Sequence, residues 1–236
     1  MDVKEPWQSL WNRQVSFLLP FAGFLIVAGA MLLAFTKTEI HLAIDAHHLG
    51  LADRLFPWVT LLGEGWTAVA LVLLLLFVRY RYALMVAASS ILAALCAQLL
   101  KHTLFAGAAR PKEFFSGIHE LHLIQGVDLL SYNSFPSGHA ATAFAACFCL
   151  AMFSGSRTVK AALFCSALVI AFSRVYLSQH FLLDIYAGAV IGVLSAAATS
   201  LCLDSTDIPL RPGGLDGSLV RRTRSLPDAR SGGRVV

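Results

Sequence analysis

The chain has 236 residues, of which 57% are hydrophobic and 14% are charged. Soluble domains carry about 25% charged residues, so this composition excludes an ordinary soluble surface, a disordered chain and a collagen-like or disulfide-rich scaffold. The net charge is only +4, and the basic residues are dispersed or lie in the C-terminal tail without interleaved aromatic residues, which argues against nucleic-acid binding. The chain is therefore expected to lie in a membrane.

Six apolar segments follow one another along the chain, and each is a candidate membrane-spanning helix. A helix rises about 1.5 Å per residue, so about 20 apolar residues cross the hydrocarbon core of roughly 30 Å. The segments cover residues 16–35, 59–78, 83–100, 140–153, 161–172 and 181–203. The fourth and fifth are short, and their flanks through Ser137 and Ser173 predict helices that end at an internal polar site. The predicted fold is all-α, a polytopic bundle of six transmembrane helices.

The segments between and after these helices carry weaker signals. Residues 36–58 combine a helical apolar pattern with charges, which predicts a helix at the membrane interface. Residues 121–129 have apolar residues on both sides of Gln125-Gly126, which predicts a small hairpin. Residues 204–236 are rich in Arg, Gly, Ser and Pro without apolar periodicity. A membrane domain of residues 1–203, with core motifs within 101–184, is therefore expected to precede a disordered cytoplasmic tail.

The distribution of basic residues over alternate loops predicts the orientation, because basic residues are retained on the cytoplasmic side. With six spans, twelve Lys and Arg residues fall on the side of both termini and six on the other. Half of the larger group lies in the tail. We expect a multi-pass protein of the plasma (inner) membrane with both termini in the cytoplasm. The connections 36–58, 101–135 and 173–180 then face the extracytoplasmic side.

Three clusters of polar residues border the apolar segments, where ionisable groups are costly and usually functional. They are Lys101 with Arg110-Pro111, then Pro136-Ser137-Gly138-His139, then Ser173-Arg174 with His180 and Asp184. The predicted topology puts all three clusters on the extracytoplasmic side. A shared site is therefore expected there.

His180 and Asp184 are four residues apart, which places them one turn apart on a single helix face. The carboxylate can hold one imidazole nitrogen, so that the other nitrogen presents its lone pair as a nucleophile. An isolated His–Asp pair is more often a structural pair. The neighbouring clusters favour catalysis, with His180 as the nucleophile and Asp184 as its orienting group.

Lys101, Arg110 and Arg174 are three cations on the same predicted side. The arginine fork matches phosphate oxygens and lysine adds a point charge, so the three together predict a phosphoryl-binding site. Any one of them alone is compatible with ordinary loop charge or with a side chain that reaches the interface from a helix end.

The segment Pro136 to His139 opens a helix. Ser137 and Gly138 stand where free backbone amides bind anions, although Pro-Ser-Gly is by itself equally typical of a turn and N-cap. His139 follows within reach of a leaving oxygen and is the candidate general acid. The spacings of His102, His119 and His122 do not suggest a zinc site, so we expect neither a metal nor a cofactor.

The three clusters resemble the three signatures of the type 2 phosphatidic acid phosphatase and vanadium haloperoxidase superfamily, in its membrane lipid phosphatase branch. The second and third signatures match without exception, as Pro-Ser-Gly-His and as Ser-Arg-x5-His-x3-Asp. The resemblance implies a six-helix core and a metal-independent phosphatase. It also implies a phosphohistidine at His180 oriented by Asp184, with protonation of the leaving group by His139. The implied phosphate-binding residues are Lys101, Arg110, Ser137, Gly138 and Arg174.

The first signature departs from the family pattern. The family usually has six residues between its lysine and its Arg-Pro, whereas eight separate Lys101 from Arg110. Two extra residues within 106–109 can bulge in a loop and leave both cations in place. The assignment of Arg110 is the firmer one, and Lys112 is the reserve candidate for the lysine.

These features predict an integral-membrane phosphatase that hydrolyses a phosphomonoester or pyrophosphate of a membrane lipid through a phosphohistidine. A lipid phosphotransferase with the same intermediate is the alternative. A non-catalytic transporter or scaffold is a remote one, because it would distribute charge through several helix centres. The expected partners are the lipid substrate and the surrounding lipids, and neither a headgroup nor an oligomeric state follows from the sequence.

Overall fold

The computed structural model describes residues 6–205, 215 and 217–220, and every regular element within them is helical. The long helices are α1 (Pro6–Ala34), α4 (Gly65–Val78), α5 (Tyr80–Thr103), α7 (Gly138–Phe153), α8 (Arg157–Tyr176) and α9 (Leu182–Ser205). The short ones are α2 (Lys37–Asp45), α3 (Gly50–Val59), the 3-10 helix η1 (Thr60–Gly63) and α6 (Pro111–Phe114). The six predicted segments overlap the six long helices one to one, which confirms the all-α fold. The second segment, 59–78, also includes the end of α3 and all of η1.

Several of these helices are long and apolar enough to cross a membrane. Four meet that criterion, namely α1, α5, α8 and α9, and the bent pair α3–η1 and α4 adds a fifth if it acts as one span. The two parts of this pair meet at 59°. Helix α7 has only 16 residues, so its crossing, and with it the predicted total of six, stays a prediction. The chain is a multi-pass membrane protein.

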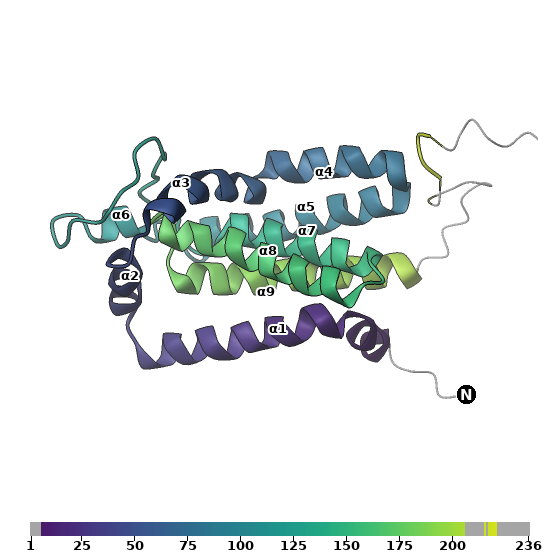
Figure 1. Ribbon diagram of the computed structural model, residues 1–236, viewed down its shortest axis with the longest axis horizontal. Helices are drawn as coiled ribbons and strands as arrows, with labels where there is room; N and C mark the ends of the chain where they lie inside the picture. Colours follow the sequence, from purple (N-terminus) through teal and green to yellow (C-terminus); the bar gives the residue numbers. More distant parts are fainter. Residues whose placement is uncertain (1–5, 206–214, 216, 221–236) are drawn as a thin grey trace, which may run out of the picture.

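Helix α7 lies at the centre of the bundle and packs against α5, α8 and α9 (Figure 1). Its buried surface is built from alanines together with Phe144 and Phe148. Small residues on α9 let the two backbones approach, since a Cβ atom at Gly188 would lie 2.5 Å from the carbonyl oxygen of Ser137. A Cβ atom at Gly192 would lie 2.9 Å from the Cβ of Phe144. The short apolar α7 is therefore shielded by protein along much of its length.

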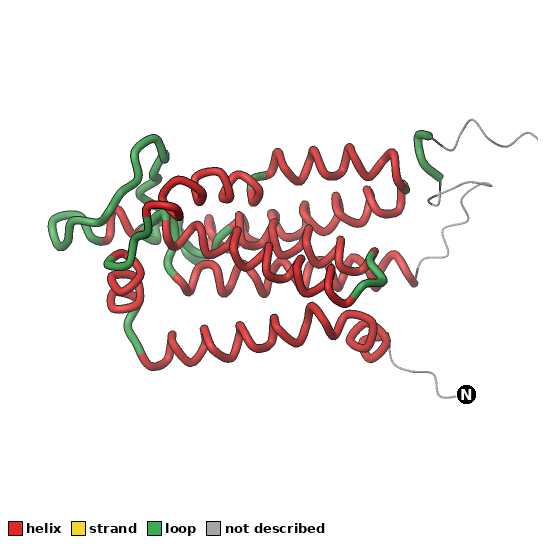
Figure 2. Tube along the Cα trace, in the orientation of Figure 1, coloured by secondary structure: helices red, strands yellow, loops and turns green. Residues whose placement is uncertain are grey.

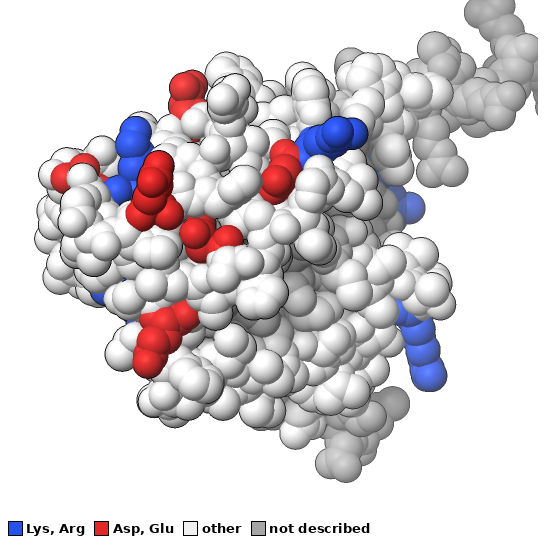
Figure 3. Space-filling model, turned by 60° about the vertical axis from the view of Figure 1, so that its left-hand side comes forward, with Lys and Arg blue, Asp and Glu red and all other residues white. Residues whose placement is uncertain are grey.

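The outer surface of the bundle is strongly apolar. Large side chains exposed on α1, α4 and α5 are Leu19, Ile26, Val27, Leu33, Leu73, Leu74, Phe77, Ile91, Leu95 and Leu99. Such a belt would be unstable in water and suits contact with lipid chains. Most of the acidic side chains in view in Figure 3 gather instead on the end that carries the short helices and loops.

The chain direction brings the predicted polar clusters to that same end. Helices α5 and α8 finish there, and α7 and α9 begin there, next to α2, α3 and α6 (Figures 1 and 2). Helix α1 begins at the opposite end of the bundle. The three clusters are thus neighbours in space, as the alternation of segments predicted.

Two expectations for the connecting segments need correction. The interfacial helix predicted over residues 36–58 is two helices, α2 and α3, with a break between Asp45 and Gly50. The hairpin predicted over residues 121–129 is wrong: this stretch is an irregular loop with a turn at Gln125-Gly126. Leu121 packs against Phe115 and Phe181, whereas Leu123 is exposed, so the apolar residues of this stretch do not form the common face that a hairpin would need.

The predicted disordered tail lies mostly outside the described residues. Where it is described, its backbone bonds to the junction of α4 and α5. The Tyr80 amide donates to the Gly217 carbonyl at 2.9 Å, and the Leu219 amide donates to the Leu76 carbonyl at 3.1 Å. This part of the tail therefore covers the end of the bundle opposite to the polar clusters.

Candidate active site

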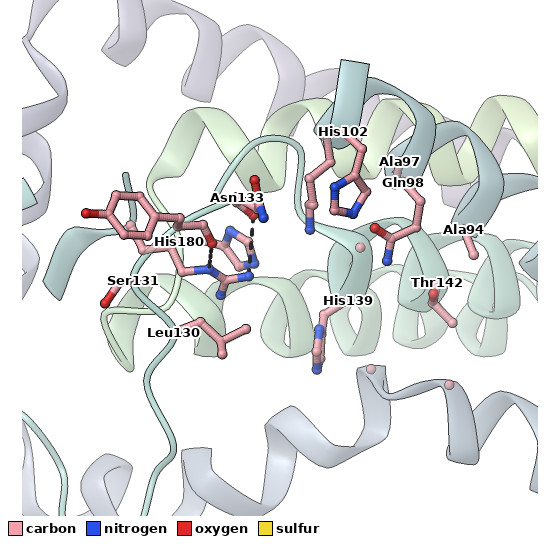
Figure 4. A pocket seen from close by; sticks show the side chains of 16 residues that line it. Ala94, Ala97, Gln98, His102, Leu130, Ser131, Asn133, His139, Thr142 and His180 are labelled. Carbon is pink, nitrogen blue, oxygen red and sulfur yellow. Dashed lines mark hydrogen bonds between the residues drawn. The ribbon is translucent and has the colours of Figure 1, made fainter. Parts of the chain in front are cut away.

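A cavity of about 670 Å³ opens at the end of the bundle where the clusters meet (Figure 4). Five of the eight predicted site residues line it: Lys101, Arg110, Gly138, His139 and His180. The other three, Ser137, Arg174 and Asp184, are almost fully buried behind its wall. Apolar lining comes from residues such as Ala94, Ala97 and Leu130, so the cavity has a polar and an apolar part.

His180 lies in the tight turn between α8 and α9. The amides of Gln179 and His180 both donate to the Arg174 carbonyl, at 2.9 and 3.1 Å, and Ser178 takes a left-handed conformation with φ 52°. His180 therefore precedes α9, which begins at Leu182, and does not share a helix face with Asp184 as predicted. The turn nevertheless places His180 Nδ1 3.2 Å from Asp184 Oδ2.

Three donors converge on that carboxylate oxygen. Asp184 Oδ2 accepts from His180 Nδ1, from the Phe181 amide at 2.9 Å and from the Ser134 hydroxyl. An acceptor on Nδ1 selects the tautomer in which Nδ1 carries the proton, so Nε2 keeps its lone pair. Burial lowers the pKa of His180 to about 4, against the opposing effect of Asp184. The imidazole is therefore neutral at neutral pH, the form a nucleophile needs.

His41 of α2 supports this turn from outside. Its ring stacks on Phe115, contacts Phe181 edge-on and lies 3.2 Å from the Ser178 hydroxyl through Nε2. Burial lowers the pKa of His41 to about 4, although Asp45 and Asp184 act in the opposite direction. Because the buried His41 imidazole resists protonation, the folded turn is expected to lose stability in acid.

The stability of the protein is accordingly expected to fall between pH 6.5 and 4. Below its ordinary pKa of about 6.5 the imidazole takes up a proton in the unfolded chain before it does so in the folded one. Through His41, the free energy of unfolding of the protein is then about 2 kcal/mol lower at pH 5, equivalent to several degrees in Tm. Replacing His41 with glutamine should shrink the Tm difference between pH 7 and pH 5, whereas the same change at exposed His47 should not.

Gln179 joins two arginines at the other side of the nucleophile. Its Oε1 atom accepts from Arg110 Nη1 at 3.1 Å and from Arg174 Nη2 at 3.3 Å. Arg110 is also held by the Tyr132 carbonyl, and Arg174 by the Thr60 hydroxyl at 2.8 Å. Burial lowers the pKa of Arg110. Arg174 Nε is buried without a hydrogen-bond partner, so part of its donor capacity is free for a ligand.

The longer connection between Lys101 and Arg110 leaves both side chains on the cavity. The connection turns at Gly107, with φ 78°, and its backbone is tied to the facing loop by bonds from Ser134 to Ala108 and from Arg110 to Ser131. The two extra residues are therefore absorbed in a loop, as expected. Lys112, the reserve candidate, is exposed and does not line the cavity.

The start of α7 forms the third wall. The Ser137 hydroxyl accepts from the Ala140 amide at 3.4 Å, and the Ser137 amide donates to the Asp184 carbonyl at 3.0 Å. The Ser137 side chain is thus committed to capping α7, and its predicted contact with phosphate is not visible in this geometry. Gly138 lines the cavity, and nothing lies within 4 Å of the position that a Cβ atom would take there. A phosphate can approach the backbone there.

The His139 side chain lies near the start of α4. Its Nε2 lies 3.6 Å from Glu64 Oε1 and has no hydrogen-bond partner. Glu64 is the N-cap residue of α4, but its side chain makes no capping bond. Burial and the charge of Arg174 lower the pKa of His139 to about 3, so the imidazole needs the negative charge of a bound phosphate to reach the protonated form that a general acid uses.

Sequence reasoning missed the residues that hold the predicted ones in place. Ser134 and Thr60 lie 50 and 114 positions from Asp184 and Arg174, their respective partners, so no local pattern links them. Gln179 had a signal, since it directly precedes the proposed nucleophile. The polar residue beside a catalytic one was the available clue.

Comparisons with known proteins bear on this arrangement. A family model described as PAP2 superfamily matches residues 81–206. The crystal structure of Aquifex aeolicus LpxE is similar, with a TM-score of 0.62 and 26% identity over 70% of this chain and 94% of that one. The crystal structure of a PAP2-type phosphatidylglycerolphosphate phosphatase from Bacillus subtilis has a TM-score of 0.58 and 20% identity over 83% and 98% of the two chains. Comparison with curated protein sequences gives no match. The family match covers more than half of the chain and includes all three polar clusters, and the chain therefore belongs to the PAP2 superfamily.

Proposed function

We propose that the protein is a membrane lipid phosphatase that hydrolyses a phosphomonoester or pyrophosphate of a lipid through a phosphohistidine at His180. The observation that carries this proposal is the shared cavity. A neutral imidazole whose Nδ1 is held by Asp184 faces the same space as Lys101, Arg110 and His139. Nucleophile, phosphate-binding cations and proton donor are thus within one site.

In the first step, His180 Nε2 attacks phosphorus and the bond from phosphorus to the lipid oxygen breaks. The leaving oxygen takes the proton of His139, which becomes neutral. Asp184 stabilises the positive charge that the attack leaves on the His180 ring, in the way a buried carboxylate supports a catalytic histidine. The products of this step are the dephosphorylated lipid and a phosphohistidine.

In the second step, water attacks the phosphohistidine. His139 accepts a proton from the water, the bond from phosphorus to nitrogen breaks, and inorganic phosphate and neutral His180 are regenerated. Lys101, Arg110 and Arg174 neutralise the phosphoryl oxygens throughout, because preorganised cations in a site with little water stabilise developing charge strongly. The backbone at Gly138 adds amide donors at the start of α7.

The proposed chemistry uses no metal. Lys101 and Arg110 at the cavity, with Arg174 buried behind its wall, supply the charge stabilisation that a metal ion would otherwise provide to a transferring phosphoryl group. Phosphate release by protein treated with a chelator is therefore expected to equal that of untreated protein. Loss of activity on chelation under conditions in which the protein stays folded, with recovery on adding one particular divalent ion, would contradict this part of the mechanism.

We place the site on the extracytoplasmic side of the plasma (inner) membrane. Arg13, Arg79, Arg81, Arg157 and Lys160 all lie near helix ends remote from the cavity, where the positive-inside rule puts the cytoplasm. The proposal has six helices crossing, with α7 shielded by its neighbours, and residues 1–203 as the catalytic membrane domain. Labelling of single cysteines placed at exposed His47 and at Gly155 with an impermeant reagent in whole cells tests it: only the cysteine at 47 should react.

The substrate is best identified with a panel of lipid phosphates. Phosphatidic acid, phosphatidylglycerol phosphate, an isoprenoid pyrophosphate and a lipid A phosphate all place phosphate at the interface on an apolar anchor. Phosphatidylglycerol phosphate has added interest because one similar structure is named for its phosphatase. Release of inorganic phosphate by purified protein in detergent, with chelator present, is the expected result, and the ranking of rates names the class.

Transfer to a second lipid or a saccharide is the alternative outcome of the same intermediate. Labelled phosphate would then appear on the acceptor in place of free phosphate. The geometry favours hydrolysis, because the cavity is open at the polar end of the bundle and admits water to the phosphohistidine. Phosphate release that requires an added acceptor would reverse this preference.

Gln179 offers a test of the phosphate-binding part of the site. A carboxylate at this position would lie between Arg110 and Arg174 and compete with the phosphoryl group for both guanidinium groups. Replacing Gln179 with glutamate is expected to raise KM by about tenfold or more, corresponding to roughly 1.4 kcal/mol. Replacing it with leucine removes the two bonds without adding charge, so the effect on KM should be smaller. Equal effects of the two substitutions would argue against competition for the arginines.

A further inference from the structure

We propose that His48, Asp53 and His122 form a zinc-binding site in the cap of the protein, separate from the catalytic cavity. The three residues come from different segments. His48 lies in the connection between α2 and α3, Asp53 lies in α3, and His122 lies in the long loop before α7. Their ligand atoms all lie within 4.8 Å of one another. None of the three lines the catalytic cavity.

The distances suit a tetrahedral ion. Zinc bonds to histidine nitrogen and carboxylate oxygen at about 2.0–2.2 Å, which puts neighbouring ligand atoms about 3.3 Å apart. His122 Nε2 lies 3.3 Å from Asp53 Oδ2. His48 Nδ1 lies 2.9 Å from Asp53 Oδ1, and the rings of His48 and His122 are 4.2 Å apart. Small rotations of these side chains would bring three ligands around one ion.

The environment of His48 is a second, independent indication. Its side chain is only 8% exposed, and its Nε2 is buried without a hydrogen-bond partner. Asp45 Oδ1 lies 3.8 Å from this nitrogen, too far for a hydrogen bond. A buried imidazole with an unsatisfied nitrogen is costly. With an ion on Nδ1, the ring carries its proton on Nε2, and a small movement toward Asp45 would give that proton an acceptor, the carboxylate–histidine–metal arrangement common at zinc sites.

The carboxylates around the cluster accept hydrogen bonds from neighbouring groups, as carboxylates at metal sites usually do. Asp53 Oδ1 accepts from the Tyr176 hydroxyl at 2.6 Å, and Asp45 Oδ1 accepts from the His122 amide at 3.0 Å. Second-layer bonds of this kind orient ligands and raise metal affinity. Asp45 lies on the Nε2 side of His48, away from Nδ1, so it is an outer partner of this kind, and a water molecule would fill the fourth position. Two imidazoles with a carboxylate are a donor set that suits zinc among the divalent ions.

A bound ion would tie the long loop to the helical cap. The same loop continues to Tyr132 and Ser134, whose carbonyl and hydroxyl hold Arg110 and Asp184. The ion is therefore structural: it stabilises the loop that roofs the cavity and takes no part in phosphoryl transfer. The acidic side chains gathered on this end of the molecule favour the approach of a cation (Figure 3).

The test uses the full chain, purified in detergent without a polyhistidine tag and stripped with a chelator. Titration with zinc should show one equivalent bound. Cobalt, used as a spectroscopic probe, should give the strong visible absorption of a tetrahedral site. Replacing His48 or His122 with alanine should weaken zinc binding at least tenfold, whereas replacing His47, the exposed neighbour of His48, should leave it unchanged. Zinc should also raise the Tm of the wild type and of the His47 variant only.

His122 is the more decisive position, because its side chain is 52% exposed and its removal leaves the core intact. Phosphate release by each variant, measured well below its Tm, reports that the bundle is folded and separates this proposal from the proposed function. Zinc binding that is absent, or equally strong in the His122 variant and the wild type, would overturn the site. The cluster would then be a network of hydrogen bonds and ion pairs only.

Discussion

Replacement of His180 with alanine is expected to reduce phosphate release by about 10⁴-fold or more, because it removes the atom that forms the bond to phosphorus. The imidazole is 1% exposed and its Nδ1 is engaged with Asp184, which leaves Nε2 as its nucleophilic atom. The measurement is release of inorganic phosphate from the best lipid of the panel. His47→Ala is the matched control, since that imidazole is exposed and remote from the cavity.

The loss must be separated from a failure to fold. The Tm of the His180 variant should stay within a few degrees of the wild type, because alanine removes a buried imidazole together with its unfavourable burial. Binding of vanadate, a mimic of phosphate, should persist through Lys101, Arg110 and Arg174. A folded variant that binds vanadate and still releases phosphate at the wild-type rate would refute His180 as the nucleophile.

The intermediate can be sought directly in the His139→Ala variant. This change slows both the protonation of the leaving oxygen and the activation of water. With a pyrophosphate substrate, whose leaving group needs little protonation, the second step should become the slower one. Labelled phosphate should then remain on the protein after denaturation at alkaline pH, where phosphohistidine survives, and it should be absent from the His139→Ala, His180→Ala double variant.

The fold could be predicted from the sequence because it depends on the length and order of the apolar segments. Apolar runs of membrane length need no tertiary information, and alternation along the chain decides which helix ends are neighbours. That is why Lys101, Ser137 and His180, far apart in sequence, were expected at one end of the bundle. Spacing along a helix was less reliable, since His180 proved to lie in a turn whose conformation depends on Ser178.

Contacts between segments far apart in the chain could not be predicted from the sequence. Thr60 meets Arg174 across the bundle, and Ser134 reaches Asp184 because a loop folds over the cavity. The cluster of His48, Asp53 and His122 has the same origin: its members are dispersed along the chain, and only the packing of the loop against α3 brings them together. The spacing rule that argued against zinc applies to sites built within one local motif, whereas this site would be built by tertiary structure.

Alanine at Gly188 is expected to lower both stability and activity, because a Cβ atom there would lie 2.5 Å from the Ser137 carbonyl oxygen and 2.9 Å from the Ala140 Cβ. Both neighbours belong to the start of α7 and have little freedom to move. Overpacking typically costs about 1–3 kcal/mol, and a clash with backbone belongs at or above the top of that range. This cost exceeds the roughly 1 kcal/mol of stability that alanine gains over glycine in a helix.

Gly23→Ala in α1 is the matched control, since nothing lies within 4 Å of a Cβ atom at that position. The two substitutions are chemically identical and should have opposite effects on Tm: a drop of several degrees at Gly188, and no change or a rise at Gly23. Activity should fall only at Gly188, because displacement of Ser137 also displaces Gly138 and His139 at the cavity. Intrinsic tryptophan fluorescence during heating, combined with phosphate release, measures both. A Gly188 variant as stable and active as the wild type would mean that the close approach of α7 and α9 does not set the geometry of the site.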